Sequence, residues 1–241
     1  MPCHSIYEQL RGNKKALVIL LDPDKIEVGQ ISNLVSKINE SVAKFIFVGG
    51  STVENSVTQQ LIERLKSLTT IPIIIFPGDV NQISEAADAM LFLSLISGRN
   101  PEYLISKQVK AANKLKTSKL EIIPTAYLLI ESGKQTAVER VSETKPMSLN
   151  DVDKIVDTAL AGQLLGMKLV YLEAGSGALN PVPNTLISRV KNAIDIPLIV
   201  GGGIRSSEQL NASFNAGADV VVIGTAFEND INFFNALKSN F

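Results

Sequence analysis

The sequence repeats one pattern eight times: a short run of apolar residues typical of β-strands, followed by a longer segment. The runs show no clean alternation of apolar and polar positions, which is typical of parallel strands buried on both faces. Segments of helical periodicity, such as 149–165 and 183–193, separate most of them. Since alternating strands and helices form a parallel sheet, and eight repeats favour closure, the pattern predicts a (β/α)8 TIM barrel. The apolar runs are 16–21, 45–48, 73–76, 90–93, 122–129, 169–172, 198–200 and 220–223.

Two segments depart from this regular pattern. Residues 78–89 leave room for a short helix at best, so we expect the third helix of the barrel to be shortened or missing. Residues 131–146 are polar, and we expect an extended loop after the fifth strand. No flexible linker divides the 241 residues, so we expect one barrel domain over 1–241. A doubly wound open sheet is the alternative, because periodicity alone does not distinguish the two folds.

Composition narrows the class of protein. A net charge of −1 without long basic runs argues against nucleic-acid binding. Cys3 is the only cysteine, which excludes a disulfide framework and suits a reducing cytoplasm. The apolar run 16–21 is too short to span a membrane, so we expect a soluble cytoplasmic protein without membrane insertion, and at most a transient membrane contact. The lone histidine, His4, precedes the first strand and is expected at the surface.

Glycines and small polar residues follow several of the predicted strands. In a barrel, the carboxyl ends of the strands carry the functional site. Gly201 to Gly203 follow the seventh strand, and Gly224-Thr225 follow the eighth. Glycines let backbone N–H groups approach an anionic oxygen, and the following helix N-termini favour negative charge. The alternative is that these glycines only make tight turns. Two such clusters at consecutive strands predict a phosphate-binding site.

Carboxylates follow two other strands of the predicted barrel. Glu173 ends the sixth strand, where it could bind a substrate hydroxyl and accept its proton, or else order the loop by pairing with a nearby cation. Asp22 and Asp24 follow the first strand, and with Ser51 or Thr52 they could bind Mg²⁺. Alternatively, the Asp-Pro-Asp segment makes a turn and caps a helix.

Five motifs together resemble a known family. In chain order they are Leu-Asp-Pro-Asp-Lys at 21–25, Val-Gly-Gly-Ser-Thr at 48–52, Tyr-Leu-Glu-Ala-Gly-Ser-Gly at 171–177, Gly-Gly-Gly-Ile-Arg at 201–205 and Gly-Thr-Ala at 224–226. The chain resembles the geranylgeranylglyceryl phosphate synthases, a prenyltransferase family that also contains the heptaprenylglyceryl phosphate synthases. The Tyr-Leu-Glu segment together with the triple glycine is the specific part of the match.

The resemblance implies a reaction and a set of site residues. It implies Mg²⁺-dependent transfer of a geranylgeranyl group from its diphosphate to the C3 hydroxyl of sn-glycerol 1-phosphate by a homo-oligomer. Asp22 and Ser51, with Thr52 as the alternative, match the metal positions, and Glu173 and Tyr127 match catalytic and substrate-site positions. Many relatives carry a lysine where this chain has Leu20, which suggests the second of the family's two groups. The glycerol phosphate positions would be Tyr171, Leu172, Glu173, Ala174, Gly175, Ser176, Gly177, Gly202, Gly203, Gly224 and Thr225.

Two other classes of function fit the same barrel. A phosphosugar isomerase or aldolase would share the phosphate site, but an aldolase needs a lysine at a strand end; Lys168 begins the sixth strand and Lys25 lies in a turn. A non-catalytic barrel that binds a phosphorylated metabolite would not need Asp22, Ser51 and Glu173 at one rim. The prenyltransferase interpretation accounts for all of these residues.

Overall fold

Eight parallel strands form a closed barrel in which each strand pairs with its neighbours in chain order and β8 pairs with β1. The structure is a computed structural model that describes residues 5–26, 28–50, 57–224, 235 and 237. The predicted barrel is confirmed, and the open-sheet alternative is wrong. The strands are β1 (Ala16–Leu21), β2 (Phe45–Val48), β3 (Ile73–Ile75), β4 (Ala89–Leu95), β5 (Glu121–Leu129), β6 (Leu169–Glu173), β7 (Leu198–Gly201) and β8 (Val220–Ile223).

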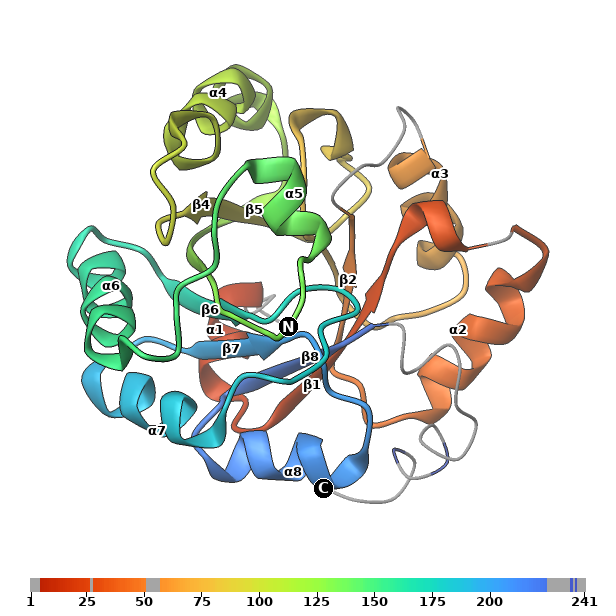
Figure 1. Cartoon of the computed structure of the whole chain (residues 1–241). Coiled ribbons are helices and arrows are strands. Elements are labelled where there is room, and N and C mark those ends of the chain that lie inside the picture. Colours follow the sequence, from red (N-terminus) through yellow and green to blue (C-terminus); the bar gives the residue numbers. More distant parts are fainter. Residues whose placement is uncertain (1–4, 27, 51–56, 225–234, 236, 238–241) are drawn as a thin grey trace.

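Helices surround the strands as an outer ring (Figure 1). Each presents an apolar stripe to the sheet: in α2, Ile31, Val35 and Ile38 are buried at the spacing of one helix face. Predicted helical segments therefore correspond to observed helices, with small differences at their ends. The ring consists of α2 (Ile31–Glu40), α3 (Val57–Lys66), α4 (Lys107–Thr117, preceded by a π-helical turn at Glu102–Ser106), α6 (Val152–Leu164), α7 (Asn184–Ala193) and α8 (Ser207–Asn215).

Apolar side chains cover both faces of the sheet, which explains why the strand sequences do not alternate. On β1, Leu17, Ile19 and Leu21 face the helices, whereas Val18 packs inside the barrel against residues such as Phe45. Burying such a strand on both faces removes nearly all of its apolar surface from water. The core therefore consists of an inner barrel cluster and an outer layer between strands and helices.

Helix α1 (Ile6–Gly12) covers the N-terminal end of the barrel and lies behind the strands in Figure 1. Leu10 is fully buried in the inner cluster. The Glu121 carboxylate at the start of β5 accepts hydrogen bonds from the backbone N–H groups of Ile6 and Tyr7. These contacts satisfy N–H groups that the first turn of a helix leaves without internal partners. The end of the barrel opposite the predicted site is thus closed by packing.

The two irregular segments differ in how well the sequence predicted them. Between β3 and β4 the chain makes only a 3₁₀ turn at Val80–Gln82, which confirms the shortened third unit. The predicted extended loop at 131–146 is wrong in part, because it contains the helix α5 (Ala137–Ser142). Glu143, at φ 50°, ends this helix in the left-handed conformation. In Figure 1, α5 lies in front of the strands, on the side opposite α1.

A search for helices with the length and apolar character needed to cross a bilayer found none within the part of the chain that the structure describes.

Candidate active site

The carboxyl ends of the strands surround a cavity of about 610 Å³. Asp22 after β1 and Gly202-Gly203 after β7 line the same cavity, so the sequence predicted correctly that these segments converge. Residues within or just after β2, β3, β5, β6 and β8 complete the wall. They include Gly49, Gly50, Phe76, Tyr127, Tyr171, Glu173, Gly175, Ser176, Gly177 and Gly224.

Glu173 lies at the wall of this cavity and is itself only 5% exposed. One oxygen of its carboxylate, Oε1, accepts a hydrogen bond of 2.6 Å from the backbone N–H of Gly175. Burial raises the pKa of Glu173 from 4.5 to about 7, although the Gly175 hydrogen bond and the nearby Tyr171 hydroxyl favour the ionised form. A carboxyl group with such a pKa can accept or donate a proton near neutral pH.

Two buried tyrosines lie beside Glu173. The rings of Tyr127 and Tyr171 contact each other edge to face at 5.4 Å between centroids, and both pack against Phe76. Burial raises the pKa of both tyrosines well above 10, so both stay neutral. The buried Tyr127 hydroxyl has no hydrogen-bond partner among the described residues, and the Tyr171 hydroxyl forms no well-aligned hydrogen bond there, although it lies near enough to Glu173 to favour the ionised carboxylate. Because buried hydroxyls without a well-aligned hydrogen bond are costly, these two groups are suited to bind a polar substrate.

The loops after β6 and β7 approach each other so closely that glycine is required. Gly202 and Gly203 have φ values of 86° and 74°, which side chains disfavour. A Cβ atom at Gly202 would lie 2.7 Å from Oε1 of Glu173, and one at Gly203 would lie 2.8 Å from backbone atoms of Asn180. The glycines therefore do more than turn corners: they allow backbone to pack directly beside the buried carboxylate.

Arg205 ties the same two loops together. Its guanidinium group donates hydrogen bonds to the carbonyl oxygens of Ala178 and Leu179 in the loop after β6. Gln209 in turn accepts a hydrogen bond of 2.8 Å from the backbone N–H of Arg205. The predicted phosphate-binding region is thus held by side chains as well as by backbone packing. The sequence motif contained Arg205, but it did not indicate this function.

Asp22 is the carboxylate that fits the predicted metal site. Its Oδ2 lies 2.9 Å from Nζ of Lys25, and its Oδ1 accepts a hydrogen bond from the backbone N–H of Asp24. Asp24 itself is exposed and does not line the cavity. The described residues contain no cluster of three His, Cys, Asp or Glu side chains that could bind a metal. One carboxylate suits Mg²⁺, which keeps several waters and also binds substrate phosphates.

A second, smaller cavity of about 100 Å³ adjoins the first. It opens where the barrel has only a 3₁₀ turn after β3 in place of a full helix. The opening lies between the segment after β3 and the start of α4. Phe92, Leu93, Tyr103 and Ala111 are among the apolar residues that line it. Gly50, Phe76, Tyr127 and Val138 line both cavities. We call this second cavity the apolar groove; it joins the first cavity at these four shared residues.

Not every predicted site residue reaches the cavity. Leu172 and Ala174 are fully buried in the layer beneath the helices and do not line it. Ser51, Thr52 and Thr225 lie outside the described residues, as do Cys3 and His4. The sequence missed Ala137, Val138 and Arg140 of α5, which line the cavity. The polar character of the 131–146 segment gave no sign of this position.

Comparison with known proteins identifies relatives over nearly the whole chain. The model of the PcrB family matches residues 9–239. A geranylgeranylglyceryl phosphate synthase from Flavobacterium johnsoniae is 55% identical over 231 residues, covering 96% of this chain and 95% of the relative. One from Zunongwangia profunda is 54% identical over 225 residues, covering 93% and 96%. The crystal structure of (S)-3-O-geranylgeranylglyceryl phosphate synthase from Thermoplasma acidophilum, in complex with its substrate sn-glycerol-1-phosphate, superposes with a TM-score of 0.90 at 37% identity, covering 97% of this chain and 96% of that one.

Proposed function

The chain belongs to the PcrB family, and we propose that it is a geranylgeranylglyceryl phosphate synthase: it transfers a geranylgeranyl group from geranylgeranyl diphosphate to the C3 hydroxyl of sn-glycerol 1-phosphate. The reaction produces the ether bond of a lipid precursor. The observation that carries the proposal is the position of Glu173. This buried carboxylate lies in the wall of the larger cavity, which we call the polar cavity because more of its lining is polar than in the apolar groove that joins it.

Glycerol phosphate fits the polar part of the cavity. The loops after β6, β7 and β8 supply glycines whose backbone N–H groups can approach a phosphate closely. The buried hydroxyls of Tyr127 and Tyr171 offer hydrogen bonds to the glycerol hydroxyls. Leu20 lines this cavity at the position where the family resemblance implies a lysine in many relatives, so we expect the phosphate to rely on the β6, β7 and β8 loops.

Glu173 is the proposed proton acceptor. The C3 oxygen of glycerol phosphate forms a bond to C1 of the prenyl chain, while the bond between C1 and the diphosphate oxygen breaks and its electron pair leaves with the diphosphate. The proton of the C3 hydroxyl moves to the Glu173 carboxylate as the new bond forms. Because its pKa is about 7, Glu173 is a stronger base than an exposed carboxylate. Holding the reactants in place supplies much of the rate.

We propose that Asp22, with Ser51 or Thr52 from outside the described residues, holds Mg²⁺. When bound, Mg²⁺ neutralises the charge that grows on a leaving diphosphate. The proposal rests on the position of Asp22 in the cavity wall and on the preference of Mg²⁺ for one or two carboxylates with water and phosphate oxygens.

The apolar groove is the proposed site of the prenyl tail. Its wall is mainly apolar, and it begins at residues that also line the polar cavity. The shortened third unit removes the helix that would otherwise cover this part of the barrel.

An assay with purified protein tests the proposed function. Labelled sn-glycerol 1-phosphate is incubated with prenyl diphosphates from ten to thirty-five carbons, with and without Mg²⁺. We expect a lipid-soluble phosphorylated product and the highest kcat/KM with geranylgeranyl diphosphate. Turnover of phosphosugars without prenyl transfer would favour an isomerase, and binding without any turnover would favour a passive metabolite-binding barrel.

A further inference from the structure

The short helix α5 contributes to both cavities at once. Ala137 and Arg140 line the polar cavity, Val141 and Ser142 line the apolar groove, and Val138 lines both. Residues three or four apart share a face of a helix, so the helix presents one side to each cavity. Helix α5 therefore covers the place where the two cavities meet.

Contacts at both ends hold α5 in this position. At its C-terminal end, the Tyr103 hydroxyl donates a 2.9 Å hydrogen bond to the carbonyl oxygen of Val141. The side-chain amide of Asn100 donates to the carbonyl oxygen of Ser142 at 2.9 Å. At the N-terminal end of α5, Thr136 packs closely on Gly175. A Cβ atom added to Gly175 would lie 2.4 Å from the methyl group of Thr136. The helix is thus fixed to the groove wall and to the loop after β6.

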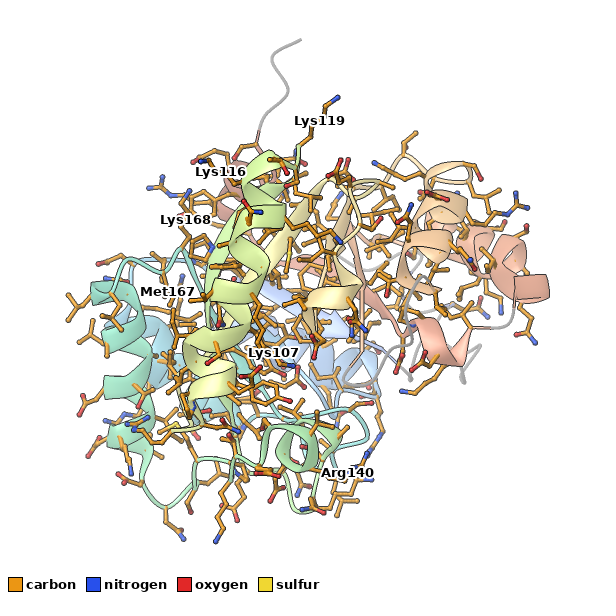
Figure 2. All side chains as sticks on the ribbon, turned by 90° about the horizontal axis from the view of Figure 1, so that it is seen from above. Lys107, Lys116, Lys119, Arg140, Met167 and Lys168 are labelled. Carbon is orange, nitrogen blue, oxygen red and sulfur yellow. The ribbon has the colours of Figure 1, made fainter. Side chains whose placement is uncertain are left out.

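Among the described residues that line the two cavities, the other cations already have partners. Lys25 forms an ion pair with Asp22, Arg205 donates to the carbonyls of the loop after β6, and Lys107 forms an ion pair of 2.9 Å with Asp79. The exposed guanidinium group of Arg140 forms no hydrogen bond or ion pair with any residue that the structure describes; only the backbone N–H of this residue is bonded, to the carbonyl oxygen of Thr136. Figure 2 shows Arg140 at the end of the molecule that carries α5. A guanidinium group with five donors thus remains available at the wall of the polar cavity.

We infer that Arg140 binds the diphosphate group of the prenyl donor and the pyrophosphate released from it. This inference rests on the proposed function. The first carbon of the donor must meet the glycerol oxygen in the polar cavity while its tail occupies the groove, so its diphosphate lies where α5 covers the junction. The glycine-containing loops after β7 and β8 lie on strands other than the one that leads into α5, and they bind the phosphate of glycerol phosphate. Guanidinium groups bind phosphate oxygens through two parallel hydrogen bonds.

The test compares Arg140→Met and Arg140→Lys with the unchanged protein. We expect Arg140→Met to raise KM for geranylgeranyl diphosphate, and the inhibition constant of inorganic pyrophosphate, by about tenfold or more. Arg140→Lys keeps the charge but not the paired donors, so its two constants should lie between those of Arg140→Met and those of the unchanged protein. The dissociation constant of glycerol 1-phosphate should stay within about twofold, since that ligand binds elsewhere. Lys145→Met removes an exposed cation from the same segment and should change none of these constants.

Three results would overturn the inference: unchanged constants in Arg140→Met, an equal effect in Lys145→Met, or a loss confined to glycerol 1-phosphate binding. Thermal unfolding of each variant shows whether it folds like the unchanged protein. Failure of the proposed function is recognised separately, as absence of prenyl transfer by the unchanged protein. Calorimetric titration with Mg²⁺ and inorganic pyrophosphate still tests Arg140 in that case, because it requires no turnover.

Discussion

At the scale of single residues, the environment of Glu173 links activity to stability. Its pKa in the folded protein, about 7, exceeds the ordinary value of 4.5, so the folded protein binds this proton more tightly than the unfolded chain does. The free energy of unfolding therefore falls as pH rises from about 4.5 to about 7. The proposed role of Glu173 as proton acceptor requires the ionised form, so kcat/KM should rise over the upper part of the same range. The buried base reduces stability under the conditions in which it works.

Replacing Glu173 by Gln separates these two effects. We expect Glu173→Gln to lower kcat/KM at pH 8 by at least about 100-fold, because the proton acceptor is lost. The free energy of unfolding at pH 8 should rise by about 1–3 kcal/mol, because no charge is buried. Urea unfolding at pH 5 and pH 8 checks the second effect, which should be smaller at pH 5. The exposed Glu85, changed to Gln, is the control; equal stabilisation at both pH values would contradict the explanation.

Asp22 gives a second prediction at this scale. Asp22→Asn keeps the shape of the side chain but removes the charge that would bind Mg²⁺. We expect Mg²⁺-dependent turnover to fall by about 100-fold or more, while glycerol 1-phosphate still binds within about twofold of the original affinity. Initial rates across a Mg²⁺ series and a binding titration measure the two quantities. If turnover by Asp22→Asn retains its full Mg²⁺ response, the proposed metal position is wrong.

At the scale of whole elements, helix α4 faces the apolar groove through Ala111, which is small and only 3% exposed. Ala111→Phe would place a ring inside the groove and shorten it. We expect kcat/KM for geranylgeranyl diphosphate to fall about tenfold or more, with a smaller loss for a ten- or fifteen-carbon donor, since each buried CH₂ contributes about 0.8 kcal/mol. Competition between two donors directly measures the ratio of kcat/KM for geranylgeranyl diphosphate to kcat/KM for the shorter donor. Ala112→Phe, on the exposed side of the helix, is the control; an unchanged ratio in Ala111→Phe would place the tail elsewhere.

The strands and the helix α5 differ in how far sequence could predict them. The run 45–48 coincides with β2 because four consecutive large apolar residues have to be buried on both faces of a sheet. Helix α5 has only six residues, and the contacts that hold it come from Asn100, Tyr103 and Gly175, which are distant in sequence. Local patterns contain no information about such contacts, so the helix and the position of Arg140 required the structure. The convergence of Asp22 with Gly202 was predictable, because barrel topology brings strand ends together.

At the scale of the whole molecule, hydrogen bonds run without a break around the barrel, from β1 through β8 and back. The N-terminal helix is tied to β5 through Glu121, and the backbone N–H of Val42 donates to the carbonyl of Leu237 near the other terminus. Removing any one unit would open the sheet. We therefore propose that residues 1–241 form one cooperative domain.

Calorimetry tests this proposal. We expect one unfolding transition whose calorimetric and van 't Hoff enthalpies agree. Saturating glycerol 1-phosphate should raise its Tm, since a ligand that binds only the folded state stabilises it. A Tm that also rises with protein concentration would support the proposed homo-oligomer. Two separate transitions would show that the chain contains independent units.

The closed N-terminal end has a practical consequence. Lys116, Lys119 and Lys168 are exposed at the top of Figure 2, whereas α5 and Arg140 lie at the bottom. A coupling group introduced selectively at one of these three positions would attach the molecule to a bead or sensor surface by its closed end. The proposed entrance for the long-chain donor would then face the solution, so an immobilised preparation could meet vesicles or detergent micelles without being turned away from them.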